Sequence, residues 1–368
     1  MKFRCLRNDI LSAIQKAEKA VAVNSTLPVM EGLLIETIGN EVCITGNDLE
    51  IAIEASFEAE ITEGGKIVLN ARMFGDIVRR SGGEFIVFES DEKFITTITS
   101  GQSVFQISGL NADEYPSSFD IDADKKIVIE CEKLKAMVKQ TLFAVAKSEA
   151  KPILTGELFS VKDGVLNIVA LDGFRLAIRK EPVIEALGIK DFVVPFKTLN
   201  ELLKVLGENG EIEIYPADRF VMFEFDNCRL ISRMLEGEYI NYQKFIQTQS
   251  PVKCKGQVRK LRDTFERVSP IISGQKVKSP VKININDDNI VIDCETLTGK
   301  VHDETAIEKL YGENLEIGFT NQFLLDVFNS CDTEEVFVEF STPLSPMVVT
   351  PLDGDRFFYI ILPIRLKK

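Results

Sequence analysis

The chain has 368 residues, is 45% hydrophobic and carries a formal net charge of −14 at pH 7. This length exceeds what one hydrophobic core usually supports, so two or three domains are expected. No run of about 20 uncharged apolar residues occurs, which excludes a membrane-spanning helix, and residues 1–5 resemble a strand rather than a signal peptide. We therefore expect a globular, cytoplasmic protein.

The cysteines are odd in number and widely scattered, and no pair has the Cys-X-X-Cys spacing. A disulfide framework or a zinc site needs clustered ligands at close spacing. Most of the cysteines lie in apolar, strand-like surroundings, so we expect buried free thiols and no metal. The seven are Cys5, Cys43, Cys131, Cys228, Cys254, Cys294 and Cys331.

The first third of the chain predicts a mixture of helices and strands. A strand at residues 1–5 precedes a helix-like run at 8–22, which ends in Ala20 and Val21. Residues 66–81 predict a second strand followed by an amphipathic helix. Further short strands are expected at 33–36, 42–45, 51–56 and 84–88.

The same order of elements returns twice. The second helix-like run ends at Val145 and the third at Val268, so these ends and Val21 are 124 and 123 residues apart. In the later strand-and-helix segments, Phe74, Leu199 and Phe323 occupy equivalent places, 125 and 124 residues apart. The segments expected in the second and third repeats are 127–147, 159–161, 166–169, 191–206, 211–215, 252–268, 282–286, 290–293, 315–331 and 335–340.

Repetition on this scale predicts the architecture. Each repeat has two helices among about eight strands, which indicates an α+β domain with its helices on one face of antiparallel sheets. We place the three domains at residues 1–122, 123–249 and 250–368.

The charge is unevenly distributed. A net charge of −14 argues against a nucleic-acid partner, but the six predicted helices together carry +7, which leaves −21 on the rest of the chain. A basic helix surface inside an acidic body suits contact with a phosphate backbone without base readout. For any single helix, an ordinary solvated face is the favoured interpretation, but repetition over several helices favours a shared basic surface. The candidate DNA-facing residues are Arg72, Arg79, Arg80, Lys133, Lys135, Lys139, Lys197, Lys204, Arg259 and Arg262.

Catalytic patterns are sparse. The single histidine, His302, lies in a polar stretch, and no nucleotide-binding loop, nucleophile elbow or zinc-protease motif occurs. Asp48 and Glu50 are spaced to share one side of a strand and so could bind a cation, but a hairpin turn with surface charges is the favoured interpretation. A metal-assisted phosphodiesterase would require turnover that is lost when Asp48 or Asp172 is changed.

Five short motifs make the chain recognisable. They are TLP at 26–28, GNDLE at 46–50, LDGFRLA at 171–177, EGEY at 236–239 and LPIRL at 362–366. In their order and spacing, from end to end of the chain, they resemble the bacterial DNA polymerase III beta subunit, the sliding-clamp family.

This resemblance implies a function without catalysis or cofactor. Two copies would join head to tail into a ring of six domains, with twelve helices lining a hole around duplex DNA. The ring would tether the polymerase III catalytic subunit, the clamp loader and other proteins that carry a clamp-binding motif, and so confer processivity.

The resemblance also implies a groove for a short hydrophobic peptide between the second and third domains. Two residues in it depart from the usual family residues: Phe174 stands where histidine is common and Ile240 where proline is common. Lys367 and Lys368 extend the usual terminal leucine. The matching positions are Leu154, Leu171, Gly173, Phe174, Arg175, Leu176, Ile240, Lys244, Phe245, Thr320, Phe323, Leu344, Pro346, Ile361, Leu362, Pro363, Ile364 and Arg365.

For the dimer, the resemblance places Phe105 and Ile107 of one copy against Ile271 and Ile272 of the other. Head-to-tail closure would cover the unpaired strands at both ends of a repeat chain. The alternative is a monomeric β-rich scaffold that binds peptides and encircles nothing.

Overall fold

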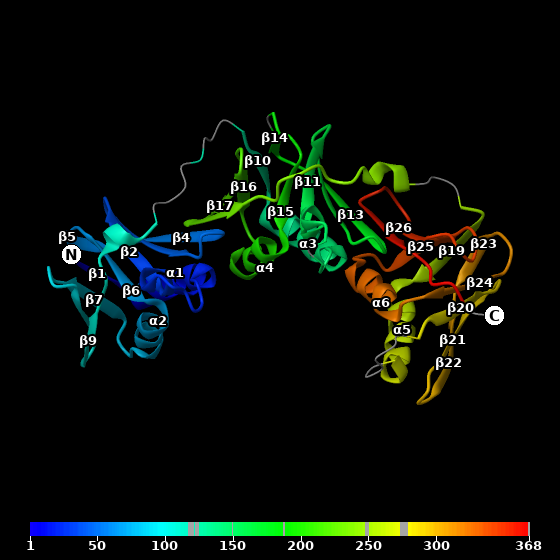
Figure 1. Ribbon diagram of the computed structural model, residues 1–368, viewed down its shortest axis with the longest axis horizontal. Coiled ribbons are helices and arrows are strands. Elements are labelled where there is room, and N and C mark those ends of the chain that lie inside the picture. Colours follow the sequence, from blue (N-terminus) through cyan, green and yellow to red (C-terminus); the bar gives the residue numbers. More distant parts are fainter. Residues whose placement is uncertain are drawn as a thin grey trace. The chain divides into compact units, whose positions relative to one another are not determined.

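The computed structural model describes residues 1–116, 121, 125–148, 150–186, 188–246, 250–272 and 279–366. The predicted boundaries near 122 and 249 fall outside these residues. Within the described part there are six α-helices (Figure 1). They are α1 (Arg7–Ala17), α2 (Ala71–Arg80), α3 (Cys131–Thr141), α4 (Phe196–Val205), α5 (Val258–Ile272) and α6 (Asn321–Ser330).

Two compact units are present. Unit 1 comprises Met1–Glu132, Val183–Ile189 and Lys197–Met234. It contains a five-stranded sheet and a nine-stranded sheet, both antiparallel. The strands of the five-stranded sheet are, in spatial order, β5 (Glu60–Glu63), β1 (Lys2–Leu6), β7 (Phe85–Ser90), β8 (Ile95–Ser100) and β9 (Ser103–Ser108). Those of the nine-stranded sheet are β14 (Glu185–Ala186), β10 (Ile127–Glu130), β16 (Glu211–Pro216), β17 (Phe220–Phe225), β18 (Cys228–Arg233), β4 (Ile51–Glu58), β3 (Glu41–Asn47), β2 (Gly32–Ile38) and β6 (Lys66–Asn70).

Unit 2 comprises Lys133–Pro182, Lys190–Phe196 and Leu235–Lys368. It contains a nine-stranded and a four-stranded antiparallel sheet. The strands of the nine-stranded sheet are, in spatial order, β15 (Phe192–Pro195), β11 (Gly156–Lys162), β12 (Val165–Leu171), β13 (Arg175–Pro182), β27 (Phe357–Ile361), β26 (Met347–Pro351), β25 (Glu335–Phe340), β19 (Val252–Gln257) and β23 (Glu308–Tyr311). Those of the four-stranded sheet are β22 (Lys300–Ala306), β21 (Asn289–Glu295), β20 (Val281–Ile285) and β24 (Leu315–Phe319).

The element order confirms the predicted α+β class and the threefold repeat. Each repeat runs strand, helix, strands and then strand, helix, strands again. Alternating side chains explain why the strands form: β25 buries Val336, Val338 and Phe340 and turns the residues between them outward. Within unit 1, α1 packs against α2, and within unit 2, α5 packs against α6. Asn321 of α6 donates a hydrogen bond to the Phe265 carbonyl of α5 over 3.0 Å.

Sheets also continue from one repeat into the next. In unit 1, β4 of the first repeat pairs with β18 of the second. In unit 2, β13 of the second repeat pairs with β27 of the third. We call each such strand pair an internal joint. Because the sheet is continuous across it, neighbouring repeats share main-chain hydrogen bonds as well as apolar contacts.

The ends of the helices and the register of the third repeat differ from the sequence prediction. The third helix-like run does not end at Val268, because α5 continues through Pro270 to Ile272. The α-helix of the first run ends at Ala17 and is followed by a 3₁₀ turn, Glu18–Ala20. Since α2, α4 and α6 begin at equivalent places in their repeats, 125 residues apart, the residue equivalent to Phe74 and Leu199 is Leu324. All three are fully buried, whereas Phe323 is half-buried.

The prediction of free, mostly buried thiols is confirmed. All seven thiols are free, and five of them are buried. Burial raises the pKa of the Cys5 thiol to about 12 and that of Cys254 to about 11, because an apolar environment disfavours the thiolate. These thiols are therefore unreactive core residues.

Among the described residues, the Glu157 carboxyl group is fully buried and has no ion pair. Glu157 of β11 is 0% exposed, and its Oε1 lies 2.7 Å from the Thr141 hydroxyl, which is also 2.8 Å from the Met137 carbonyl. The Thr141 hydroxyl donates to Glu157 Oε1, whereas the buried Oε2 has no hydrogen-bond partner among the described residues, so the apolar surroundings favour the neutral acid. Burial raises the pKa of Glu157 well above its usual range.

This arrangement predicts a pH dependence of stability. The pKa of Glu157 is higher in the folded than in the unfolded chain, so its stabilising contribution is complete below about pH 4.3 and declines as pH rises toward the folded pKa. We expect Glu157→Gln to remove a decline of about 1.4 kcal/mol per pH unit in that window. Urea unfolding at pH 5, 6, 7 and 8 measures this. The exposed Glu313→Gln is the matched control, and parallel curves for Glu157→Gln and the parent would refute the prediction.

Candidate functional site: a peptide groove and the helix surface

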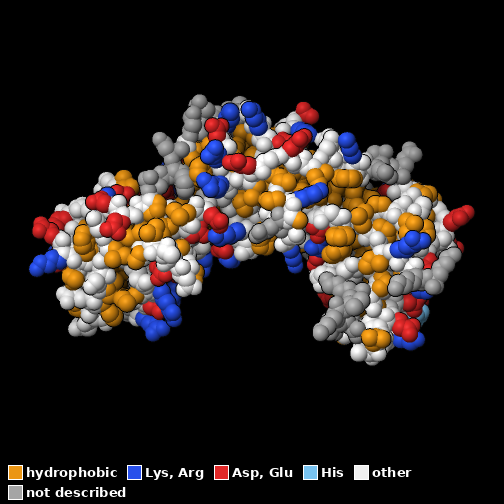
Figure 2. Space-filling view, in the orientation of Figure 1, with side chains coloured by type: hydrophobic (Ala, Val, Ile, Leu, Met, Phe, Trp, Pro, Cys, Tyr) orange, Lys and Arg blue, Asp and Glu red, His pale blue; other side chains and the backbone are white. Residues whose placement is uncertain are grey.

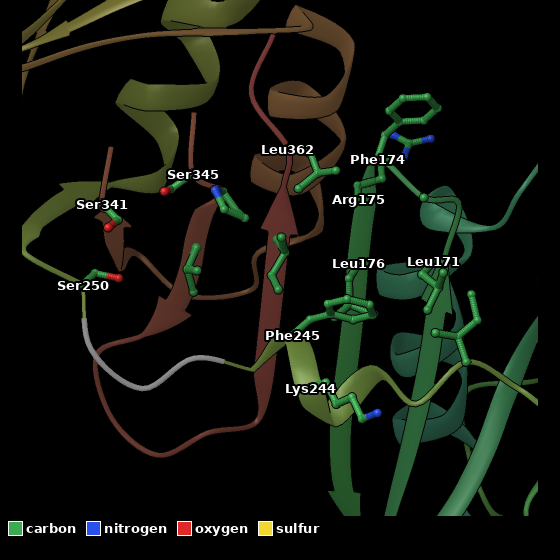
Figure 3. Close-up of a pocket in the computed structure, with 15 residues that line it drawn as sticks. Leu171, Phe174, Arg175, Leu176, Lys244, Phe245, Ser250, Ser341, Ser345 and Leu362 are labelled. Carbon is green, nitrogen blue, oxygen red and sulfur yellow. The ribbon is translucent and has the colours of Figure 1, made fainter. Parts of the chain in front are cut away.

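A cavity of about 240 Å³ lies within unit 2 (Figure 3). Its walls come from the β12–β13 turn, from β26 and β27, and from the segment that links the second and third repeats. The lining residues are Leu171, Gly173, Phe174, Arg175, Leu176, Ile240, Lys244, Phe245, Ser250, Ser341, Ser345, Pro346, Val348, Ile360 and Leu362. We call this cavity the groove.

The groove has an apolar part and a hydroxyl-bearing part. Leu171 and Leu176 lie on one side in Figure 3, and Ser250, Ser341 and Ser345 lie on the other. The aromatic rings remain accessible, since Phe174 is 62% and Phe245 is 50% exposed. Exposed aromatic rings beside buried leucines form a surface that a hydrophobic peptide can cover.

Arg175 lines the groove with its charge already neutralised. Its Nε donates to Asp172 over 3.0 Å and its Nη1 donates to Asp326 of α6. The guanidinium also lies over the Phe323 ring, 4.4 Å from the centroid. The side chain is only 6% exposed. Arg175 therefore connects β13 to α6, rather than presenting a free cation to a peptide.

The turn before Arg175 is fixed by Asp172. Its Oδ1 accepts the backbone N–H groups of Phe174 and Arg175, at 2.9 and 3.1 Å, and Gly173 adopts a φ of 90° that favours glycine. In unit 1, Asp48 makes a similar turn, and Lys197 donates to both Asp48 and Glu50. The turn interpretation of these acids is confirmed, because their oxygens are occupied within the protein.

Ten of the eighteen expected peptide-site residues line the groove and eight do not. Leu154 and Ile361 are buried in the cores beneath it. Phe323 lies beside it, with its ring 6.5 Å from that of Phe174. The remaining five outside the lining are Thr320, Leu344, Pro363, Ile364 and Arg365.

The C-terminal residues after β27 are hydrogen-bonded both to the groove wall and to the four-stranded sheet. The Leu362 N–H donates to the Phe174 carbonyl over 2.8 Å, and the Ile364 N–H donates to the Gly318 carbonyl of β24 over 2.7 Å. Lys367 and Lys368 lie outside the described residues. The tail therefore adds to the edge of the four-stranded sheet and positions Leu362 in the groove.

Five lining residues were not predicted: Ser250, Ser341, Ser345, Val348 and Ile360. Strand alternation could have identified both apolar residues, since Ile360 lies two residues before Leu362 on one side of the strand, and Val348 lies between the buried Met347 and Val349. The serines carry no pattern that marks them, because they come together only through the fold.

The candidate DNA-facing residues all lie on α2, α3, α4 or α5, but most of them are not free. Arg79, Lys197, Lys204, Arg259 and Arg262 form ion pairs with nearby carboxylates. Lys133 and Lys135 also have partners. Among the described residues, Arg72, Arg80 and Lys139 have no ion-pair partner. Figure 2 shows basic side chains gathered over α2.

The expected dimer residues lie near free ends of the two units' sheets. Phe105 and Ile107 are half-buried on β9, which is an edge strand. Ile271 and Ile272 end α5 and are also half-buried. The Ile271 side chain lies beside Gly299, at the end of the β21–β22 hairpin.

The described part of the chain is expected to hold no metal, and its histidine and acidic residues lie as follows. No group of three or more His, Cys, Asp or Glu there could hold a metal ion. His302 is exposed on β22, and Asp293, 2.7 Å away, raises its pKa by hydrogen bonding and charge. No helix among the described residues has both the length and the hydrophobicity to cross a membrane.

Comparison with known proteins identifies the family. Models of the DNA polymerase III beta subunit match three successive segments that make up most of the chain: the N-terminal domain at residues 1–119, the central domain at 128–241 and the C-terminal domain at 245–365. The beta sliding clamp of Staphylococcus epidermidis is 32% identical over 375 residues, covering 99% of each chain. That of Halalkalibacterium halodurans is 32% identical over 380 residues, covering 99% of this chain and 100% of its own.

Solved structures agree. The DNA polymerase sliding clamp of Bacillus subtilis has a TM-score of 0.94 at 30% identity, with 100% of both chains covered. A putative DNA polymerase III beta subunit from Eubacterium rectale gives the same values. With three repeats, joined sheets and family models that match from end to end, this chain belongs to the DNA polymerase III beta subunit family, the bacterial sliding clamps.

Proposed function

We propose that two copies of this chain close head to tail into a ring that encircles duplex DNA without sequence specificity. The groove would tether the polymerase III catalytic subunit, the clamp loader and other proteins with a clamp-binding peptide. The family consists of processivity factors, so the chain is an accessory subunit and not an enzyme, as the sequence predicted. We assign its site of action to the cytoplasm and its domains to residues 1–122, 123–249 and 250–368.

The two internal joints are the observation that best supports the proposed ring. Both have the same polarity: a strand of one repeat pairs with the last strand of the next. Both also end in the same hydrogen bond, from Arg233 N–H to the Glu50 carbonyl at 3.0 Å and from Leu362 N–H to the Phe174 carbonyl at 2.8 Å. Because the same strand pairing occurs twice, we expect any further contact between consecutive repeats to use the same strands in the same register.

In the third repeat the equivalent strand has no partner on its outer side among the described strands. β22 occupies the place of β4 and β13, while β9 of the first repeat occupies the place of β18 and β27; both are edge strands. Applying the internal register places Gly299 opposite Ile107 and Val301 opposite Phe105 of a second copy. The pairing would be antiparallel, would cover two exposed edges and would close the ring.

The groove supports the tethering role. Its leucines and accessible aromatic rings suit leucine and phenylalanine anchors of a short peptide. Lys244 and Arg365 are exposed cations at and near the groove, available for polar or acidic peptide groups. A peptide of this kind would bind at about micromolar affinity, roughly −8 kcal/mol.

The exposed helix cations support contact with DNA. We expect replacement of Arg72, Arg80 and Lys139 by glutamine to lower the slope of log affinity against log salt by about 0.9 for each phosphate that the variant no longer neutralises. The measurement is DNA binding from 50 to 300 mM salt. The control replaces Lys253, Lys282 and Arg229, which lie on strands. Equal slopes for the helix variant and the parent would remove these residues from the DNA surface.

The mass in solution tests the ring directly. Light scattering at micromolar concentration should give about twice the 41.2 kDa chain mass. A ring should then be retained on closed circular DNA and released when that DNA is cut. A monomer at every concentration would overturn the encircling mechanism and leave a peptide-binding scaffold.

A further inference from the structure

Three turns are equivalent by their hydrogen bonds. In each, the side-chain oxygen of the first residue accepts the backbone N–H groups of the third and fourth residues, and the first N–H donates to the fourth carbonyl. We call them turn I, turn II and turn III. They begin at Asp48, Asp172 and Thr296 and lead into β4, β13 and β22.

At both internal joints this turn is tied to the second helix of the next repeat. At turn I, Lys197 of α4 donates to Asp48 over 2.7 Å and to Glu50 over 2.8 Å. At turn II the polarity is reversed, because Arg175 donates to Asp326 of α6. In each case a charged pair fastens the turn to the helix beside the paired strands.

Turn III contains no charged residue that could form such an ion pair with a helix. It consists of Thr296, Leu297, Thr298 and Gly299, and Leu297 is 100% exposed. At each internal joint the turn contacts the second helix of the next repeat. In the proposed ring, the repeat that follows the third is the first repeat of a second copy, so the helix facing turn III would be α2 of that copy. Since α2 and α4 begin 125 residues apart, Arg72 holds the place of Lys197. Arg72 is exposed and has no ion-pair partner within the described part of the chain.

We propose that the joint between copies lacks the polar tie found at both internal joints, so that Thr298 and Arg72 of the partner subunit set how readily the ring opens. This inference rests on the proposed head-to-tail ring. The joint is then closed without the charged pair that connects each internal turn to its helix. The two internal joints keep their ties, and opening is confined to the contact between copies.

Installing the missing carboxylate tests the proposal. Thr298→Glu places a carboxylate where Glu50 lies in turn I, facing Arg72 of the partner subunit, and Thr298→Gln is the uncharged control of similar size. We mix donor-labelled and acceptor-labelled dimers and follow subunit exchange by energy transfer. In 50 mM salt we expect Thr298→Glu to exchange about two- to fivefold more slowly than Thr298→Gln. The difference should vanish near 0.5 M salt, because an exposed ion pair is screened.

A double variant isolates the pair. Adding Arg72→Gln should return the exchange rate of Thr298→Glu to that of Thr298→Gln. Equal rates for the two single variants, or slowing that persists without Arg72, would overturn the missing tie while the dimer stands. A parent chain that is monomeric at all concentrations would instead overturn the ring itself, so the two failures are distinguishable.

Discussion

Replacing Arg175 by methionine should destabilise unit 2 by about 3–5 kcal/mol. The side chain is 6% exposed, and its guanidinium serves Asp172 and Asp326 at once. Removing one member of a buried charged group leaves the others without compensation, which costs more than the intact group contributes. Equilibrium urea unfolding measures the destabilisation. Peptide affinity should fall as well, because Asp172 and Asp326 would no longer hold the groove wall against α6.

Two further variants separate the buried network from the simple removal of an arginine. Arg365→Met removes the same side chain from an exposed position with no ion pair in the described residues, and should change stability by less than about 0.5 kcal/mol. The double variant Arg175→Met/Asp326→Asn should be less damaging than the sum of its parts, because the residues act together. An Arg175→Met protein as stable as the parent would show that the network contributes nothing net.

Removing residues 363–368 should weaken binding of a short peptide with leucine and phenylalanine anchors at least 100-fold, about 2.7 kcal/mol, while the dimer persists. The deletion takes away the hydrogen bond from Ile364 to Gly318 that holds the tail on β24, and so frees Leu362 at the groove. The proposed dimer strands β9 and β22 are not touched. Fluorescence anisotropy measures the peptide affinity and light scattering the mass.

A substitution can displace the tail without shortening it. A side chain on Gly318 would begin 2.7 Å from Leu366 and 2.9 Å from the Ile364 carbonyl, so Gly318→Val should also weaken peptide binding. Deleting only residues 367 and 368 is the control and should preserve affinity. Full affinity in the longer deletion would mean that the tail has no part in the site.

Element positions were predictable because their signal is local. Alternation such as that in β25 and the apolar stripe of α3, where Leu134 and Val138 are fully buried, depends only on which face meets the core. Element ends were less certain. Val268 is buried within α5 instead of ending it, because packing against the core carries the helix beyond Pro270.

The groove was predictable in part. Its apolar residues sit in motifs whose resemblance to a family located them, and ten of the eighteen line the cavity. The role of Arg175 was not predictable, since Asp326 lies far along the chain and reaches it only through the β13–β27 joint. The serine-lined side has the same origin, because Ser250 and Ser341 belong to different segments.

By itself, the sequence determined three repeats, an α+β class, free buried thiols and basic helices on an acidic body. Each follows from residue type and spacing over short distances, where periodicity and burial are tightly linked. Only the tertiary structure decided how the repeats join, which cations are already paired, and that turn III lacks the tie of turns I and II. These depend on strands paired across the chain, which bring together side chains that no local pattern connects.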